Sequence, residues 1–246
     1  MCTLVLLRRP AAEWPLLLAA NRDELRSRPS RPPGRHWPDR PHIRAGLDVE
    51  AGGTWLGVND DGLVAGVLNR RGTLGPAPGK RSRGELVLEA LDHAEAFPAA
   101  EALRALDPAA WRPFNLIVAD AIDAFWLRHA GDGAITLHPI ADGLHMIEAG
   151  ELDDPASPRL GRFLPQFGFV DAPDPEAGDW SSWETLLADR TARTDDPRDA
   201  MCIVTDGEYG TVSSALLALP RHATEVPVFR HAEGRPGEQE FVDVPG

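Results

Sequence analysis

Cysteines, aromatic residues and long apolar runs are scarce in this chain of 246 residues. Its two cysteines, Cys2 and Cys202, are too few for a disulfide-stabilised scaffold and lack the spacing of metal ligands. No apolar run approaches the roughly 20 residues of a membrane-spanning helix. In the apolar start at residues 1–7, the arginines follow the apolar residues, whereas a signal peptide has them first. These absences predict reduced thiols, no membrane span and a cytoplasmic protein.

Lysine is also nearly absent, and acidic residues outnumber basic ones. The net charge of −13 argues against nucleic acid as a partner, because a nucleic-acid-binding protein needs a basic surface. Residues 1–83 hold 14 basic and 8 acidic residues, a net +6, whereas residues 84–246 have a net charge of −19. Residues 62–84 hold five cations and no acid, so they form either a solvated loop or a site for an anionic or amphipathic small molecule. The ligand-binding candidates in this stretch are Arg70, Arg71 and Arg81.

The composition is that of an ordinary globular chain. Hydrophobic residues make up 43% and charged residues 26%, and the length is sufficient to bury one substantial core. No Gly/Ser-rich or charged linker divides the sequence. We therefore expect a single domain over residues 1–246.

The order of periodic segments predicts two groups of strands with helices between and after them. Strand patterns occur at residues 2–8, 16–21, 54–59, 63–69, 114–120, 124–129, 134–139, 143–148, 201–205, 211–219, 225–230 and 241–244. Helical spacing occurs at residues 82–91, 98–106, 159–167 and 182–190. This order predicts an α+β fold of two packed antiparallel sheets with helices outside.

Cys2 becomes the first residue if Met1 is removed, which a side chain as small as cysteine permits. An N-terminal nucleophile carries its own base, because an α-amine with a pKa of about 7.7–8.0 can accept the thiol proton near neutral pH. Position 2 is equally suitable for a small apolar residue at the start of a strand. The position alone leaves both interpretations open.

Polar residues also gather where two predicted strands end. Asn21-Arg22-Asp23-Glu24 ends the second strand, and hairpin pairing with the first strand brings it near Cys2. A carboxylate there can hold the α-ammonium group, and an arginine can lower the thiol pKa or bind an anionic substrate. Asn69 ends another strand, and its amide can donate to a developing oxyanion. Each group also fits an ordinary polar strand end.

A third motif is rich in glycine. Residues 52–57 read Gly-Gly-Thr-Trp-Leu-Gly, directly before a predicted strand. Glycine lacks a Cβ atom, so this pattern predicts a turn with a close approach between backbones.

Six segments together resemble the transport and Golgi organisation family, also called the NRDE family. They are Met1-Cys2-Thr3-Leu4, residues 21–24, residues 52–57, Asn69-Arg70, Phe114-Asn115-Leu116 and residues 209–214. The family resembles a branch of the N-terminal nucleophile hydrolases, which implies a four-layer α-β-β-α sandwich.

The resemblance also implies roles for individual residues. Cys2 corresponds to a nucleophile that attacks a linear amide, Asp23 to the supporting aspartate and Asn69 to the oxyanion donor. Arg22 is the candidate arginine, although the arginine of those enzymes precedes its aspartate by three residues, where this chain has Ala20. Asn21 is a candidate substrate contact.

Two further departures concern the arginine and the oxyanion donor. Many relatives carry arginine within residues 209–214, where this chain has Val212. Many also have a Ser-Asn pair where this chain reads Leu-His-Met-Ile at residues 144–147.

Two hypotheses follow from the resemblance. The first is an N-terminal nucleophile hydrolase of a non-peptide carbon–nitrogen bond, which requires no cofactor and no metal. The alternative is a non-enzymatic protein that binds and moves haem or another amphipathic ligand, with His36, His42 or His145 as candidate iron ligands.

Overall fold

The chain forms two antiparallel sheets, and each sheet belongs to one of two compact units. The computed structural model describes residues 2–222 and 225–246. The first unit comprises Met1–Arg28, Asp142–Ala218 and Val228–Pro245, and the second comprises Pro29–Ala141, Leu219–Pro227 and Gly246. The predicted α+β class with two antiparallel sheets is confirmed.

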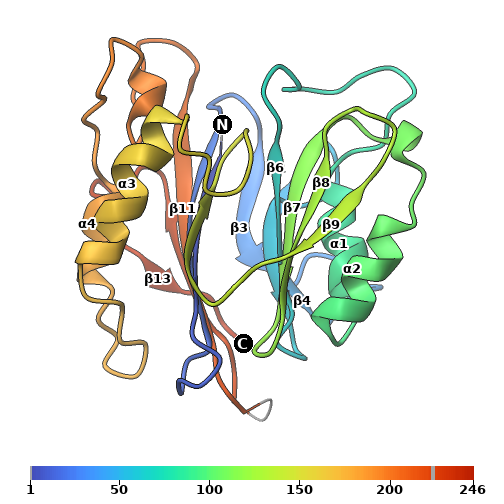
Figure 1. Cartoon of the computed structure of the whole chain (residues 1–246), viewed down its shortest axis with the longest axis horizontal. Helices are drawn as coiled ribbons and strands as arrows, with labels where there is room; N and C mark the ends of the chain where they lie inside the picture. Colours follow the sequence, from blue (N-terminus) through green and yellow to red (C-terminus); the bar gives the residue numbers. More distant parts are fainter. Residues whose placement is uncertain (1, 223–224) are drawn as a thin grey trace. The chain divides into compact units, whose positions relative to one another are not determined.

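The first unit contains a six-stranded sheet in the order β10-β1-β2-β11-β12-β13 (Figure 1). Its strands are β1 (Thr3–Arg8), β2 (Leu16–Leu25), β10 (Gly143–Ile147), β11 (Tyr209–Leu219), β12 (Val228–Glu233) and β13 (Val242–Asp243). The helices α3 (Pro158–Phe169) and α4 (Ser181–Leu187) cover one face, and a 3-10 helix, η2, spans Pro197–Asp199. Alternate residues of the strands, such as Val5 and Leu17, form a core with Phe163 and Trp183 of the helices.

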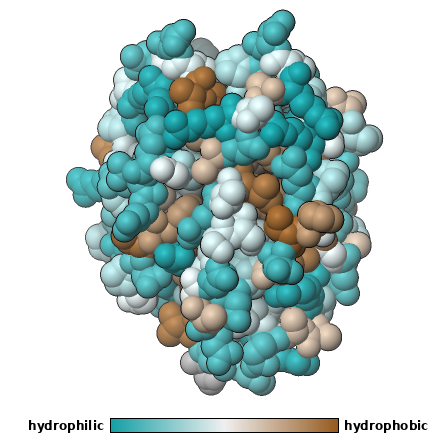
Figure 2. Space-filling view, turned by 90° about the vertical axis from the view of Figure 1, so that its left-hand side faces the viewer, coloured by the Kyte–Doolittle hydropathy of each residue, from teal (hydrophilic) through white to brown (hydrophobic). Residues whose placement is uncertain are grey.

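The outer surface of these helices is mainly hydrophilic, with apolar side chains in separate small groups (Figure 2). Phe169, at the end of α3, is 93% exposed. Within the described residues, no helix is long and apolar enough to cross a membrane.

The second unit contains a seven-stranded sheet in the order β3-β4-β5-β6-β7-β8-β9. Its strands are β3 (Ser30–Gly34), β4 (Ile43–Asp48), β5 (Leu56–Asn59), β6 (Val64–Asn69), β7 (Phe114–Ala119), β8 (Ala124–His129) and β9 (Thr136–Pro139). The helices α1 (Gly84–Leu91) and α2 (Ala96–Arg104) pack on this sheet and share its core, and a 3-10 helix, η1, spans Pro108–Ala110.

Most predicted elements are present, and the exceptions have physical causes. The predicted strand at residues 201–205 is wrong, because the amide of Cys202 bonds to the carbonyl of Asp189 and the amide of Ile203 bonds to the hydroxyl of Thr211. Strands β3 and β4 were not predicted, because prolines and arginines obscure the alternation there. Strand β2 extends to Leu25 and includes the whole Asn-Arg-Asp-Glu tetrapeptide.

The predicted close approach of backbones at the glycine-rich segment is confirmed. A Cβ atom on Gly53 would lie 2.7 Å from the carbonyl carbon of Gly84, at the start of α1. A Cβ atom on Gly84 would in turn lie 2.9 Å from the amide nitrogen of Thr54. Both contacts are with backbone atoms, which cannot move aside as a flexible side chain can. Two glycines therefore set how closely α1 approaches the start of β5.

We expect Gly53→Ala to lower the free energy of unfolding by about 1–3 kcal/mol, because the added methyl group forces two backbone segments apart. The measurement is urea-induced unfolding followed by circular dichroism. Gly207→Ala is the control, because the nearest atom to its Cβ position is 3.8 Å away. Equal stability of the two variants would contradict the interpretation.

Candidate functional site

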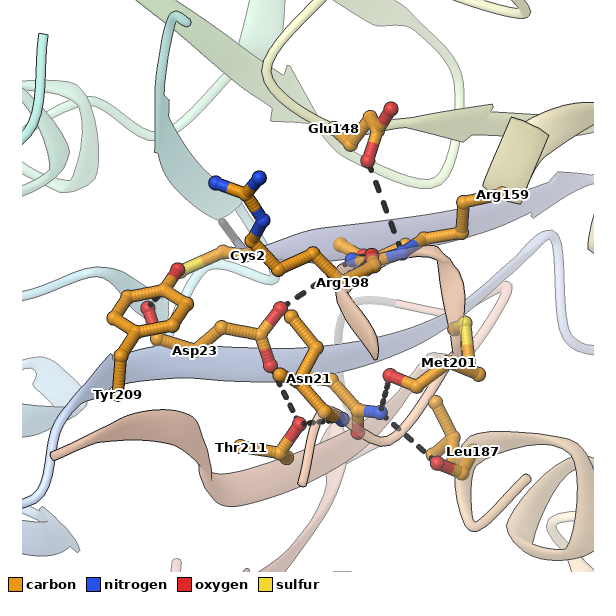
Figure 3. A network of polar contacts seen from close by, with 12 residues as sticks. Cys2, Asn21, Asp23, Glu148, Arg159, Leu187, Arg198, Met201, Tyr209 and Thr211 are labelled. Atoms are coloured by element: carbon orange, nitrogen blue, oxygen red, sulfur yellow. Dashed lines mark hydrogen bonds and ion pairs between the residues drawn. The ribbon is translucent and has the colours of Figure 1, made fainter. Parts of the chain in front are cut away.

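The thiol of Cys2 lies beside the end of β2. Antiparallel pairing of β1 with β2 sets Thr3 opposite Asn21, so Cys2, the residue before Thr3, lies beside Arg22 and Asp23 at the end of β2. The Cys2 Sγ donates to the backbone carbonyl oxygen of Asp23 at 3.8 Å, and the Tyr209 hydroxyl donates to the same oxygen at 3.2 Å. The predicted proximity of the tetrapeptide to Cys2 is confirmed (Figure 3).

The carboxylate of Asp23 is buried and bonded from two sides. Thr211 of β11 donates its hydroxyl to Oδ1 at 2.6 Å. Arg159 of α3 places Nη1 3.3 Å from Oδ2. A buried carboxylate is stable only with such partners, so β11 and α3 both contribute to holding the charge of Asp23.

Arg159 is the centre of this cluster, with only 1% of its surface exposed. Besides Asp23, its guanidinium donates to the hydroxyl of Thr3 and to the backbone carbonyl of Arg198. Its Nε lies 3.8 Å from a carboxylate oxygen of Glu148. Figure 3 shows the guanidinium between the two carboxylates.

Glu148 connects this cluster to the first turn of α3. Ser157, the N-cap residue, donates its hydroxyl to Glu148 at 2.6 Å and accepts the amide of Leu160 at 3.1 Å. A carboxylate near a helix N-terminus is favoured by the helix dipole. Glu148 therefore both accepts a hydrogen bond from the N-cap serine and offsets the positive charge of Arg159.

The buried side chain of Asn21 hydrogen-bonds to three other segments of the first unit. Its side-chain amide donates to the carbonyls of Leu187 and Met201 at 3.0 and 2.9 Å, and its oxygen accepts the hydroxyl of Ser214 at 2.6 Å. We predicted a substrate contact here, but these bonds connect β2 to β11, α4 and the segment before β11. Asn21 is fully buried.

Arg22 projects from the opposite face of the sheet, since neighbouring residues of a strand alternate between faces. Its charge lowers the pKa values of two groups, Cys2 and His231. His231 on β12 is buried, and chiefly this burial lowers its pKa to about 4. His231 is therefore neutral at physiological pH.

Burial raises the pKa of the Cys2 thiol above its ordinary value. Asp23 adds to this effect, and Arg22 opposes it. Arg22 thus acts on the thiol pKa in the predicted direction, and burial outweighs its effect. Cys202 is fully buried, and burial raises the pKa of its thiol too.

The other predicted site residues belong to the second unit. Asn69 ends β6, and its pairing partner on β7 is Phe114. Arg70 donates to the side-chain oxygen of Asn115 at 2.7 Å, and Arg71 is exposed.

Arg81, a predicted ligand contact, is paired with carboxylates of α1. Its guanidinium lies 2.7 Å from Glu85, also contacts Glu89, and stacks over the ring of Trp111.

The three candidate iron-binding histidines each have a protein partner. His36 bonds to the carbonyl of Pro32, and His42 lies 3.7 Å from a carboxylate oxygen of Asp92. The Nδ1 of His145 lies 2.6 Å from Asp153. Among the described residues, no group of three or more His, Cys, Asp or Glu side chains is placed to hold a metal ion.

Arg159 was missed by sequence reasoning, although the sequence contains a signal for it. It is the second residue after Ser157 and follows Pro158, so it lies in the first turn of a helix. A cation is unfavourable there because the helix dipole is positive at this end. An arginine in this position predicts a compensating carboxylate.

Comparison with known proteins identifies relatives of the sequence. Residues 1–161 match the model of a family described as Transport and Golgi organisation 2. The Transport and Golgi organization 2 homolog of Mus musculus is 43% identical over 86 residues, which are 32% of this chain and 30% of the relative. The Bos taurus homolog is 40% identical over 90 residues, 34% of this chain and 31% of the relative. The matched segment thus spans about 30% of the length of these relatives.

Solved structures share the fold at low sequence identity. An N-acylethanolamine-hydrolyzing acid amidase ortholog from Caenorhabditis elegans has a TM-score of 0.58 at 14% identity, covering 88% of this chain and 92% of that one. Penicillin V acylase from Agrobacterium tumefaciens has a TM-score of 0.53 at 14% identity, with 95% and 83% covered. A variant of conjugated bile acid hydrolase from Clostridium perfringens has a TM-score of 0.56 at 12% identity, with 98% and 92% covered. The fold is that of the N-terminal nucleophile hydrolases.

His231 generates a pH-dependent prediction. Its folded-state pKa of about 4 lies below the ordinary value of 6.5, so its stabilising effect is present above pH 6.5 and is lost as the pH falls towards 4. This lowers the free energy of unfolding of the wild-type protein by about 3 kcal/mol at low pH, and we expect His231→Asn not to show this decrease. Urea unfolding of both proteins at several pH values measures it, and parallel pH profiles would refute it.

Proposed function

Because the chain belongs to the Transport and Golgi organisation 2 family and has the N-terminal nucleophile fold, we propose that it hydrolyses a linear, non-peptide amide through Cys2. One observation carries the proposal: the Cys2 thiol is bonded to the backbone of Asp23, whose buried carboxylate is held by Thr211 and Arg159. The named activities of the structural relatives, an amidase, an acylase and a hydrolase, are of the same class.

The proposed reaction has two steps. The Cys2 Sγ attacks the amide carbonyl carbon, and the α-amine of Cys2 takes the thiol proton and passes it to the nitrogen that leaves as an amine. This step forms a thioester. A water molecule, deprotonated by the same amine, then attacks the thioester and releases a carboxylic acid and the thiol.

The thiol pKa explains why this mechanism requires the amine. Burial raises that pKa, so the thiol is protonated at neutral pH and needs a base. An α-amine on Cys2 has a suitable pKa of about 7.7–8.0 and exists there only after Met1 is removed. Met1 lies outside the described residues.

The developing oxyanion also requires donors. The family resemblance alone implies this role for the side-chain amide of Asn69, together with a backbone N–H group. Strand β10 carries Leu144, His145, Met146 and Ile147 in place of a second side-chain amide. For an anionic part of the substrate we retain Arg70 and Arg71 as contacts and omit Arg81, whose charge is already paired.

The proposed mechanism predicts that the mature protein lacks Met1. Intact-mass spectrometry of protein purified from its native host should give the mass of the chain from Cys2 onwards. Active protein that retains Met1 would exclude an own-amine mechanism.

Cys2→Ser should abolish turnover, because a hydroxyl is a far poorer nucleophile than a thiol at neutral pH. We expect at least about a hundredfold loss of kcat, which corresponds to about 2.7 kcal/mol, with substrate binding retained. The assay uses a panel of N-acyl aminocoumarins that differ in the length and charge of the acyl group. Cys202→Ala is the matched control and should keep full turnover. Full activity of Cys2→Ser would contradict the proposal.

A ligand carrier is the second candidate, and the fixed ring of His145 is the observation that favours it. In this case the ligand is haem or another amphipathic anion. His145 fits an iron-binding role best of the three histidines, since Asp153 fixes its ring as carboxylates do for metal-binding histidines. Haemin binding that survives Cys2→Ser but is lost in His145→Ala, with no turnover in any variant, would favour the carrier.

A further inference from the structure

The buried guanidinium of Arg159 has a placement that helix formation does not explain. It lies in the first turn of α3, where the helix dipole opposes a cation, and it is removed from water. Burying an arginine costs several kcal/mol unless carboxylates and hydrogen-bond acceptors compensate it. The compensation here comes from four other segments of the first unit, through Thr3, Asp23, Glu148 and Arg198.

We propose that Arg159 is a positioning residue for the Cys2 nucleophile, acting through Asp23. The inference rests on the proposed role of Cys2 and extends it to a residue that does not itself contact the thiol. Asp23 connects the two residues, because its carboxylate forms an ion pair with Arg159 while its backbone carbonyl accepts a hydrogen bond from the thiol.

The first part of this role is geometric. Arg159 and Thr211 hold the two carboxylate oxygens of Asp23, one from α3 and one from β11. This fixes the side chain and, with it, the orientation of the Asp23 carbonyl that accepts the thiol. Glu148 and the carbonyl of Arg198 hold the guanidinium in turn. A lysine, with one ammonium group, cannot reproduce this forked set of contacts.

The second part is electrostatic. Two charged side chains act on the thiol, Asp23, which raises its pKa, and Arg22, which lowers it. Arg159 offsets the negative charge of Asp23 from the far side of its carboxylate. Without Arg159, the uncompensated carboxylate should disfavour the thiolate more strongly. Without Asp23, the remaining guanidinium should favour it.

The test measures thiol reactivity and needs no substrate. Iodoacetamide labelling of the folded protein is followed from pH 6 to 10 by peptide mass spectrometry, with Cys202 as an internal reference for local unfolding. Arg159→Met should slow labelling of Cys2 at pH 7 about tenfold, which corresponds to a rise of about one unit in the thiol pKa. The double variant Arg159→Met/Asp23→Asn should return the rate to within about threefold of wild type.

The matched control is Arg162→Met, one turn further along α3, where the arginine pairs with Asp189. It should leave the labelling of Cys2 unchanged. If Arg159→Met does not fold, Asp23→Asn replaces it: this variant should label faster than wild type, and adding Arg159→Met should reverse the gain. An unchanged Cys2 rate in folded Arg159→Met, or equal rates for Asp23→Asn and the double variant, would overturn the inference.

The result is separable from that for turnover. The variants could change the labelling rate of Cys2 as expected while the wild-type protein hydrolyses no amide. That outcome would refute the proposed hydrolase and leave the coupling between Arg159 and Cys2 in place. Conversely, an active enzyme whose kcat and Cys2 labelling rate are both insensitive to Arg159 would refute the coupling alone. Arg159→Lys adds a kinetic readout: positioning predicts a lower kcat with little change in KM.

Discussion

The need to keep the buried carboxylate of Asp23 charged is the constraint on which the first unit depends. A carboxylate removed from water requires a cation and hydrogen-bond donors, and one strand cannot supply them. The donors come from Thr211 on β11 and Arg159 on α3. The order of the sheet and the packing of α3 are therefore both needed to satisfy the two carboxylate oxygens of Asp23. Glu148 and the cap of α3 then follow, because the guanidinium that satisfies Asp23 must itself be satisfied.

Strand alternation divides the roles of the Asn-Arg-Asp-Glu tetrapeptide. Asn21 and Asp23 point towards the helices, where the first braces the backbone and the second meets Arg159. Arg22 lies on the other face and influences Cys2 and His231 by charge. Residues that form one polar run in the sequence thus act on two faces of the sheet. The Cys2 thiol is influenced from both, by the carbonyl of Asp23 and by the charge of Arg22.

The sequence predicts local pairing well and distant partners poorly. The register of β1 and β2 follows from alternation in a hairpin, so the approach of Cys2 to Asp23 could be foreseen. The contact of Asp23 with Arg159 joins residues 136 positions apart, and no periodicity encodes that separation. The predicted strand at residues 201–205 failed for a related reason, because a buried loop satisfied by a threonine side chain has the same apolar composition as a strand. The two glutamates that pair with Arg81 were likewise not foreseen, although helical spacing places them beside it.

The discontinuity of the first unit has a consequence for how the protein is made. Residues 29–141 form most of the second unit and leave the ribosome as one continuous segment, so that unit can fold early. The β1–β2 hairpin is synthesised first but must wait for β11, its neighbour in the sheet. At about 5–20 residues per second, the interval between Asp23 and Thr211 is roughly 10 to 40 s. During translation, Cys2 therefore remains without its assembled surroundings until the second unit's long segment and β11 have been synthesised.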